Sequence, residues 1–450
     1  MRQGFSGDGG TTRIAVIGTG ISGMAAAWLA GKTCEVTLYE TEDRIGGHSN
    51  TVAVEVDGGN VPVDTGFIVY NELNYPNLVA LFEHLGVQTD ATNMSFAASL
   101  DDGSFEYSGT GFGGLFGQRR NAARPRFWRM MSDVVRFYRD APRMLQRPEL
   151  DDLTLGDFLR QEGYSQAFID DHLLPMGAAI WSTTANDMRD YPLKAFLRFF
   201  CNHGLVQFKD RPQWRTVRGG SIEYVRRLMG DFRGEVRLGS RVVEVRSEAR
   251  GVLVKDASGN EDRFDQVILA TRADDALAVI AGPDRREQEV LGCFRYTRNR
   301  AVLHGDRAVM PRRKQVWSSW NYIGGKQSEG DRPLCVTYWM NRLQTLSTSK
   351  PIFVTLNPCR DIDPGHVIRT FDYKHPLFDQ AAMQAQRRLW DLQGRRGIWF
   401  CGAYFGSGFH EDGLQAGLAV AEQLTGTRRP WTLSDPSGRI FAPAMLEAAE

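Results

Sequence analysis

The chain has few cysteines and no arrangement in which they would act together. Its six cysteines are scattered over 450 residues, with no C-x-x-C pair and no cysteine–histidine cluster. The sequence therefore predicts neither a disulfide framework nor a structural zinc site, which is typical of a reducing, cytoplasmic environment. Residues 1–12 are polar and lack the apolar stretch of a secretory leader, which favours the same location.

The chain also lacks an excess of either charge. Its 54 basic residues are matched by 54 acidic ones, so no global attraction to polyanions exists and no nucleic-acid partner is predicted. No Ser-His-Asp order and no metal-ligand spacing is evident, and no metal is expected. Any redox chemistry would then come from an organic cofactor, with the protein supplying position and electrostatics.

Glycine, in contrast, is abundant, and the first glycine motif has the surroundings of a dinucleotide site. A β-branched run at 13–17 predicts a buried parallel strand. Gly18, Gly20 and Gly23 follow as G-x-G-x-x-G and open an alanine-rich helix, and a second apolar strand ends at Glu40. The glycines permit a tight turn and close approach of the backbone to a pyrophosphate, and the carboxylate can accept hydrogen bonds from a ribose.

Further glycine segments bear on which dinucleotide is bound. Gly46 and Gly47 lie just beyond the ribose acid, and 402–413 is glycine-rich near the other end of the chain. The doublet resembles the second half of the fingerprint in flavoproteins of the glutathione-reductase and amine-oxidase type, which points to FAD over NAD. A second G-x-G-x-x-G, starting at Gly109, lacks the apolar helix and strand of a βαβ unit and is interpreted as a flexible glycine loop.

The nucleotide-like pieces are separated by two long insertions, the first of which is expected to be mostly helical. The predicted fold class is therefore α/β, a Rossmann-type FAD-binding domain combined with a discontinuous α+β substrate domain. The expected FAD-binding domain comprises 1–95, 205–290 and 390–450, and the expected substrate domain comprises 96–204 and 291–389.

Taken together, these motifs resemble the flavin-containing amine oxidase superfamily, which also holds protoporphyrinogen oxidases and carotenoid desaturases. The resemblance covers most of the chain, including a helix start at 218–221 and a strand at 265–271. More narrowly, 47–49, 64–67, 320–322 and 409–413 resemble a bacterial subgroup of FAD-dependent oxidoreductases associated with cyclopropane-type and methylated fatty acids. Some members of that subgroup are linked to the desaturation of phospholipid acyl chains.

Two positions depart from the superfamily pattern. Ala403 stands where an acid usually follows the glycine of the last strand, so no side-chain contact with the ribityl end of FAD is predicted there. His48 stands where Arg or Lys commonly follows the glycine doublet, which argues against a standard amine oxidase.

The motifs and the resemblance together imply the site residues. Asp412 is expected to cap a final helix at 413–424, whose dipole would stabilise negative charge on the reduced flavin. Proton transfer is assigned to His410, Glu411 and His48, with hydrogen bonding to the flavin or backbone as the alternative. The expected cofactor-binding residues are Gly18, Gly20, Ile21, Ser22, Gly23, Glu40, Thr41, Arg44, Gly46, Gly47, His48, Val243, Thr271, Gly402, Ala403, Asp412, Gly413 and Leu414. The expected substrate-lining residues are Phe67, Trp181, Trp320, Tyr322 and Tyr404.

The resulting functional hypothesis is hydride removal by an FAD-dependent oxidoreductase from a hydrophobic substrate, with desaturation of a lipid acyl chain preferred. Oxidation of an amine to an imine is the first alternative, which an aromatic cage with a carboxylate would favour. A flavin-binding, membrane-associated scaffold without turnover is the second.

A basic stretch at 118–147 holds nine arginines against two aspartates. From Phe127 onward its apolar residues recur on one helical face, with arginines on the other. This pattern favours contact with a membrane surface, which would suit a lipid substrate and a peripheral location. An ordinary surface helix that packs its apolar stripe on the core is the competing interpretation. The sequence does not fix the oligomeric state.

Overall fold

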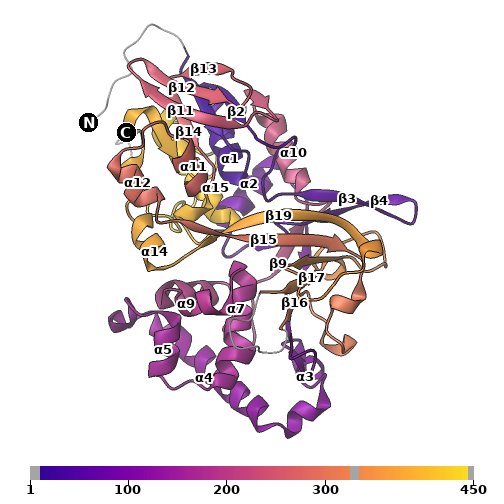
Figure 1. The fold of residues 1–450 in the computed structure, drawn as a ribbon. Coiled ribbons are helices and arrows are strands. Elements are labelled where there is room, and N and C mark those ends of the chain that lie inside the picture. Colours follow the sequence, from indigo (N-terminus) through magenta and orange to yellow (C-terminus); the bar gives the residue numbers. More distant parts are fainter. Residues whose placement is uncertain (1–10, 325–333, 444–450) are drawn as a thin grey trace.

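A computed structural model describes residues 11–324 and 334–443 of the chain. Of the polar stretch at 1–12, residues 1–10 lie outside these ranges. Figure 1 shows an upper region of sheet and helices, a lower region of helices, and long strands between the two. The upper region is assembled from segments that are far apart in the sequence, whereas the helices of the lower region come from one continuous stretch at 111–202, as the colours in Figure 1 show.

The upper region contains a parallel five-stranded sheet in the order β10-β2-β1-β14-β20. All four strand pairings are parallel, and β1 lies at the centre because it pairs with both β2 and β14. Its residues are almost wholly apolar, as expected for a strand covered on both faces. The strands are β1 (Arg13–Ile17), β2 (Glu35–Tyr39), β10 (Glu235–Arg237), β14 (Gln266–Leu269) and β20 (Ile398–Phe400).

Helix α1 packs on one side of this sheet, with α15 and α10 against α1 and α2 against both of these, and an antiparallel meander lies against the other side of the sheet. The helices are α1 (Ile21–Ala30), α2 (Pro76–Leu85), α10 (Ile222–Asp231) and α15 (His410–Thr425). The meander consists of β11 (Val242–Glu248), β12 (Gly251–Asp256) and β13 (Glu261–Phe264).

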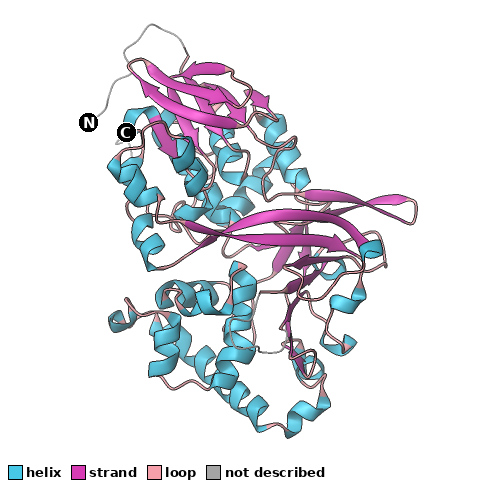
Figure 2. Cartoon of the chain, in the orientation of Figure 1, coloured by secondary structure: helices cyan, strands magenta, loops and turns pink. Residues whose placement is uncertain are grey.

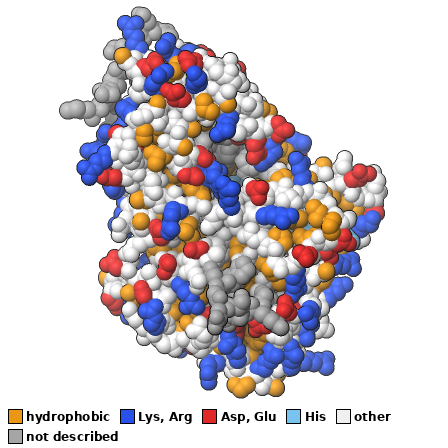
Figure 3. Space-filling model, in the orientation of Figure 1, with side chains coloured by type: hydrophobic (Ala, Val, Ile, Leu, Met, Phe, Trp, Pro, Cys, Tyr) orange, Lys and Arg blue, Asp and Glu red, His pale blue; other side chains and the backbone are white. Residues whose placement is uncertain are grey.

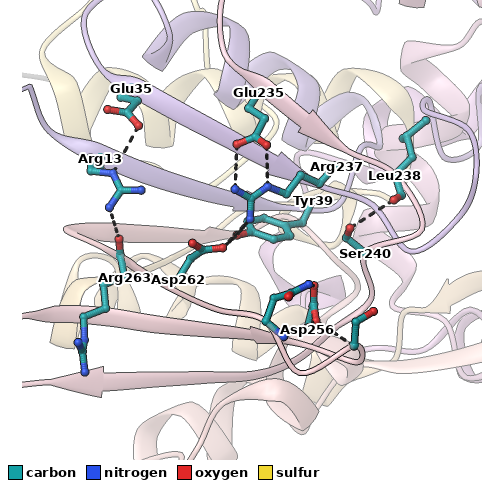
Figure 4. A network of polar contacts seen from close by, with 12 residues as sticks. Arg13, Glu35, Tyr39, Glu235, Arg237, Leu238, Ser240, Asp256, Asp262 and Arg263 are labelled. Carbon is teal, nitrogen blue, oxygen red and sulfur yellow. Dashed lines mark hydrogen bonds and ion pairs between the residues drawn. The ribbon is translucent and has the colours of Figure 1, made fainter.

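An ion-pair network ties the meander to the end of β2 (Figure 4). The guanidinium of Arg237 pairs with Glu235 at 2.9 Å and also with Asp262 of β13. Tyr39, the last residue of β2, donates to Asp262 at 3.1 Å and accepts from Arg237 at 3.0 Å. The network therefore fixes the strand end that precedes Glu40.

The middle of the molecule is a seven-stranded sheet in the order β19-β15-β18-β17-β16-β7-β8. Its two longest strands, β15 and β19, run between the upper and lower regions (Figures 1 and 2). The strands are β7 (Phe96–Leu100), β8 (Phe105–Ser108), β15 (Arg295–His304), β16 (Trp320–Ile323), β17 (Val336–Trp339), β18 (Phe353–Leu356) and β19 (Val367–Leu377).

The expectation that the first insertion is mostly helical needs correction at its start. β7 and β8 form a hairpin, because Asp101, Asp102 and Gly103 all adopt positive φ and turn the chain sharply. Helices follow: α3 (Gly111–Leu115), α4 (Pro125–Met144), α5 (Leu155–Gln161), α6 (Gln166–Phe168), α7 (Leu174–Trp181), α8 (Ala185–Arg189) and α9 (Leu193–Asn202).

The apolar stripe of α4 packs inward on the lower region. Phe127, Val134, Tyr138 and Ala141 are buried, and α4 contacts α6 and α9. The stripe that suggested membrane contact is therefore covered by protein. Within the described residues, no helix is long and apolar enough to cross a bilayer.

The closest helix contact in the upper region joins α1 to α15 through small residues. A Cβ atom at Gly417 would lie 2.1 Å from the carbonyl oxygen of Ser22, and one at Gly413 would lie 3.1 Å from Ile21. Only glycine lets the two backbones approach so closely. The contact sets the N-termini of both helices side by side.

The final helix begins three residues earlier than expected, at His410. Phe409 occupies the N-cap, and Asp412 lies in the first turn, where its carboxylate accepts the Phe409 N–H at 2.8 Å. The predicted start was wrong because Asp412 satisfies the helix end from inside the first turn rather than from the cap.

Replacing Gly417 with alanine is expected to destabilise the protein by about 1–3 kcal/mol, because the added methyl meets backbone that cannot move aside. Thermal or urea unfolding measures the loss. Gly230→Ala is the matched control: Gly230 lies in α10 with nothing within 4 Å of its added Cβ, and the change should be neutral or stabilising by up to about 1 kcal/mol. Equal stability of both variants would refute the close contact.

Candidate functional site

A cavity of about 390 Å³ lies where the three parts of the fold meet. Its upper wall is formed by the N-terminal ends of α1 and α15, and its lower wall by α7, α9 and strands of the seven-stranded sheet. The cavity is therefore continuous from the glycine motifs to the predicted substrate region.

The two N-terminal glycine motifs touch each other at this cavity. Gly20 and Gly47 both line it, and a Cβ at Gly47 would lie 3.0 Å from the Cα of Gly20. A Cβ at Gly20 would meet nothing within 4 Å, so its open side faces the cavity. Gly23 instead packs against the Gly18 carbonyl, where a Cβ would lie only 1.9 Å away. Gly20 thus leaves room for a ligand, and Gly23 makes the turn possible.

The helix that follows is suited to a phosphate group. No side chain caps the N-terminus of α1, and Ile21 and Ser22 of its first turn line the cavity. The free N–H groups and the positive end of the helix dipole favour an anion there. At the adjacent strand end, the half-buried Glu40 accepts hydrogen bonds from Thr19, including its backbone N–H at 3.0 Å.

The C-terminal glycine segment forms the opposite side of the same cradle. Thr271 follows β14, and Gly402 and Ala403 follow β20, and all three line the cavity. Gly413 packs next to the backbone of Ala403: a Cβ atom added at Gly413 would lie 3.6 Å from the Ala403 nitrogen. A group with a phosphate at α1 and a flat ring at α15 fits this cradle, which is the shape of FAD.

The remaining predicted cofactor residues lie around the cradle or outside it. Gly46 adopts φ 113°, and Arg44 donates to the Gly47 carbonyl at 2.9 Å, so both hold the doublet in place. Thr41 is exposed beyond Glu40. Val243 lies 40% exposed at an irregularity of β11, and Leu414 is buried in α15; neither lines the cavity.

Glu411 and Asp412 do not reach the cavity, which corrects their assigned roles. The Glu411 carboxylate accepts the backbone N–H groups of Asn77 and Leu78 at 3.0 Å and so caps α2. Asp412 is fully buried and pairs with Arg439 at 2.7 Å. Burial raises the pKa of both carboxyl groups. Both side chains are occupied with holding helices, and neither is placed to act as a base on a substrate.

His410 and His48, in contrast, line the cavity. The His410 ring stacks on Phe67 at 3.7 Å between centroids, and its Nε2 is 3.0 Å from the Ser49 hydroxyl. His48 lies inside the protein but is exposed, because it lines the cavity. Its ring stacks on Tyr373. Burial lowers the pKa of His410 to about 3 and, with Arg272 and Arg44, that of His48 to about 4.

Two further histidines in the cavity were not predicted. His375 accepts from the Asn299 amide at 3.0 Å through Nδ1, which leaves its Nε2–H as a donor. His203 stacks on Phe199 at 3.8 Å, and its Nδ1–H donates to the Phe199 carbonyl at 2.9 Å. The His203 Nε2 is then an acceptor, buried and without a partner among the described residues. No sequence motif surrounds either residue, so only the fold could reveal them.

Aromatic side chains form much of the substrate end. Trp181, Trp320 and Tyr404 line the cavity, and each has a buried N–H or O–H without a hydrogen-bond partner in the described chain. Phe67 also lines it. Tyr322 does not: it is fully buried further along β16, inside the sheet. Its assignment as a substrate residue was wrong, because the strand leaves the cavity after Trp320.

The charged residues among the described lining are all basic. Arg211, Arg272 and Lys374 line the cavity, and no described aspartate or glutamate does. Arg211 is exposed, so the cavity reaches the surface there. The lining thus combines apolar surface, neutral imidazoles and positive charge. Within the described residues, no cluster of potential metal ligands is present.

Fold and site together define an FAD-dependent oxidoreductase: a dinucleotide cradle opens directly into an aromatic substrate cavity. The chain belongs to the flavin containing amine oxidoreductase family, whose sequence pattern matches residues 21–291. A comparison with curated proteins finds no match.

Solved structures with the same fold include enzymes of different specificity. A putrescine oxidase bound to putrescine has a TM-score of 0.65 and 14% identity, covering 92% of this chain and 99% of its own. A CLA-producing fatty acid isomerase from P. acnes has a TM-score of 0.64 and 14% identity, with 92% and 98% covered. Cyclohexylamine oxidase from Brevibacterium oxydans IH-35A has a TM-score of 0.63 and 16% identity, with 92% and 100% covered. At these identities the likeness establishes the fold.

Gly20→Ala should fold normally but bind FAD about 10- to 100-fold more weakly, because its methyl projects into the space where pyrophosphate would lie. The measurements are thermal unfolding of the FAD-free protein and titration with FAD. Gly23→Ala is the contrasting variant, since its methyl meets the Gly18 carbonyl and should destabilise the FAD-free protein itself. Unaltered FAD affinity in Gly20→Ala would contradict the assigned cradle.

The buried neutral histidines predict that the protein loses stability in acid. His203 has its pKa lowered to about 3 by burial, so between about pH 6.5 and 3 the unfolded chain binds a proton that the folded protein does not. The free energy of unfolding should therefore fall as the pH falls through this range. In His203→Phe this slope should be smaller by about 1.4 kcal/mol per pH unit, measured by urea unfolding. Identical slopes would show that folding does not lower the pKa of His203.

Proposed function

We propose that the protein removes two hydrogens from adjacent carbons of a lipid acyl chain and leaves a double bond. The observation that carries this proposal is the chemistry of the cavity lining. An amine substrate is protonated near neutral pH and calls for a carboxylate or an unopposed aromatic cage. The described lining contains no aspartate or glutamate that could hold an ammonium group. Of its basic residues, Arg272 is paired with Asp274 and Asp275 and Lys374 with Asp274, whereas Arg211 forms no ion pair within the described chain and can attract a carboxylate or phosphate.

The apolar residues of the lining suit a flexible chain. Met94, Met176, Ile180, Leu205 and Leu356 line the cavity beside the aromatic side chains. Methionine side chains adapt to irregular apolar shapes, and burying methylene groups supplies about 0.8 kcal/mol each. A chain entering beside Arg211 would keep its acidic end at the surface while its carbons pass towards His203 and Phe409.

FAD, when bound, supplies the acceptor for the hydride. The chain's own residues then have two tasks: to hold the two carbons against the ring, and to accept the proton from the second carbon as the C–H electron pair becomes the double bond. We assign the proton to His203 Nε2, because the Phe199 carbonyl accepts the Nδ1–H and so leaves Nε2 as an acceptor without a partner in the described chain, on a residue that lines the cavity. The apolar lining excludes water from the reacting carbons.

The two alternatives make different demands on the site. Amine oxidation is disfavoured because the described lining contains no carboxylate for an ammonium group. A scaffold without turnover would not need a substrate cavity continuous with the cofactor cradle, yet the two are continuous here.

The test is anaerobic reduction of the FAD-loaded protein. Saturated fatty acids and acyl lipids should bleach the flavin absorbance and yield products two hydrogens lighter by mass spectrometry, while primary amines should not. His203→Gln should keep the FAD spectrum and affinity but slow bleaching about 100-fold or more, because proton removal typically contributes 10²–10⁴ to such steps.

A variant that fills the cavity provides the control. Met176→Trp should block bleaching by long chains and leave FAD binding unchanged, since Met176 lies on α7, away from the glycine cradle. Bleaching by amines alone would overturn the acyl-chain assignment. Flavin that no substrate of either class reduces would favour the scaffold.

A further inference from the structure

The outer surface of α3 and α4 combines two features that do not involve the cavity chemistry. Lys and Arg side chains gather over the lower end of the molecule, with hydrophobic side chains exposed at its lowest edge (Figure 3). We call this surface the basic–aromatic face and define it by the exposed apolar residues Phe112, Trp128, Val135 and Phe208 together with the arginines of 119–147.

The apolar members of this face are unusually exposed for their size. The exposed fraction is 84% for Phe112, 52% for Trp128, 51% for Val135 and 61% for Phe208. Such side chains cost free energy in water unless something covers them. They are distinct from the buried stripe of α4, which packs on the core.

Two of these side chains lie on α4, and a third packs against that helix. Trp128 and Val135 are two turns apart on α4. Phe208 packs on Tyr138 of the same helix at 5.1 Å between centroids, and Trp128 lies 6.0 Å from Phe116 at the end of α3. The face therefore extends along most of α4, whose 20 residues span about 30 Å.

Phe112 lies in α3, within the glycine-rich segment between β8 and α4 that was expected to be a loop; the short helix at 111–115 corrects that expectation. Gly111 adopts φ 72°, and a Cβ at Gly111 or Gly113 would meet nothing within 4 Å. The neighbours of Phe112 thus leave open space around it, and its side chain is exposed. The second G-x-G-x-x-G of the chain follows a strand that is antiparallel to its neighbour and is absent from the cavity lining, so it presents an aromatic side chain rather than a phosphate site.

Four of the nine arginines of 119–147 are paired with carboxylates, and the other five form no ion pair within the described chain, which leaves a net positive charge on this face. Arg119, Arg129 and Arg143 are exposed and form no ion pair within the described part of the chain. The two aspartates of α4 are engaged: Asp133 accepts the Ser165 N–H, and Asp140 pairs with Arg139. Because the whole chain is neutral, this positive charge is a local feature.

From this arrangement we propose that the basic–aromatic face docks on an anionic phospholipid bilayer. Exposed aromatic side chains insert at the level of the lipid headgroups, and each nearby arginine adds attraction to an anionic surface. The cavity reaches the surface at Arg211, three residues from Phe208, so docking would bring its opening to the lipid. A protein partner would not account for this continuity with an apolar cavity.

The test is sedimentation of the full-length protein with vesicles, which requires no turnover and is independent of the proposed reaction. Binding is expected to vesicles of phosphatidylcholine with phosphatidylglycerol, to weaken with added salt, and to be slight with phosphatidylcholine alone. Arg129→Glu with Arg143→Glu should reduce partitioning by roughly tenfold or more. Phe112→Ser with Trp128→Ser should reduce it on both kinds of vesicle.

Matched controls lie on other parts of the surface. Arg285→Glu replaces a 91% exposed arginine side chain on α12 (Arg285–Leu291), and Ile368→Ser replaces a 43% exposed side chain on β19; neither should alter binding. As a direct readout, vesicles with brominated acyl chains should quench tryptophan fluorescence in the wild type and less in Trp128→Phe.

Three results would overturn the proposal: no binding to anionic vesicles at low salt, equal losses in the controls, or quenching that is unchanged in Trp128→Phe. Analytical ultracentrifugation tests the alternative that a second copy of this chain binds to the face. A dimer that Phe112→Ser dissociates, together with no vesicle binding, would assign the face to a second copy of this chain instead.

Discussion

The close contact of α1 with α15 is the constraint on which the site depends. Helix α1 carries the N-terminal glycine motif and α15 follows the C-terminal one, and they meet where Gly417 approaches the Ser22 carbonyl. The two helix ends can face one cofactor only because no side chain separates the backbones. The cradle thus depends on glycines of two kinds. Gly20 and Gly47 leave space for the ligand, and Gly23 and Gly417 bring the backbones together.

A second constraint is the buried carboxylate of Asp64, which links two of the motifs by which the chain resembles its family, 64–67 and 218–221. Asp64 accepts hydrogen bonds from the Ser221 N–H at 2.9 Å, from the Thr51 hydroxyl and from the Gln344 amide. Its carboxylate therefore joins the hairpin of β3 (Thr51–Val56) and β4 (Gly59–Asp64) to the start of α10. Burial raises the pKa of Asp64 to about 6. These two motifs, far apart in the sequence, thus join the hairpin to the helix through Asp64, which does not line the cavity.

The sequence predicts the cofactor side of this protein well and the substrate side poorly. The glycine motif is a local pattern with a fixed physical purpose, so its strand, helix and acid could be placed from the residues alone. His203 and His375 have no such pattern, since their roles arise from Phe199 and Asn299 at neighbouring positions of the fold. The prediction for Glu411 was wrong for the opposite reason. Its carboxylate lies next to a glycine motif, which suggested a role in proton transfer, but it instead caps the nearby N-terminus of α2.

The order in which the chain supplies its parts has a consequence for biosynthesis. The central strand β1 pairs with β14, more than 250 residues later, and β20 and α15 follow the entire substrate region. Pairings of such long range are slow to form, because a long loop must close before the contacts can stabilise it. The cofactor cradle is therefore completed only after 398–425 have emerged from the ribosome. Until then the apolar edge of β14 has no partner and is exposed to aggregation or to chaperones.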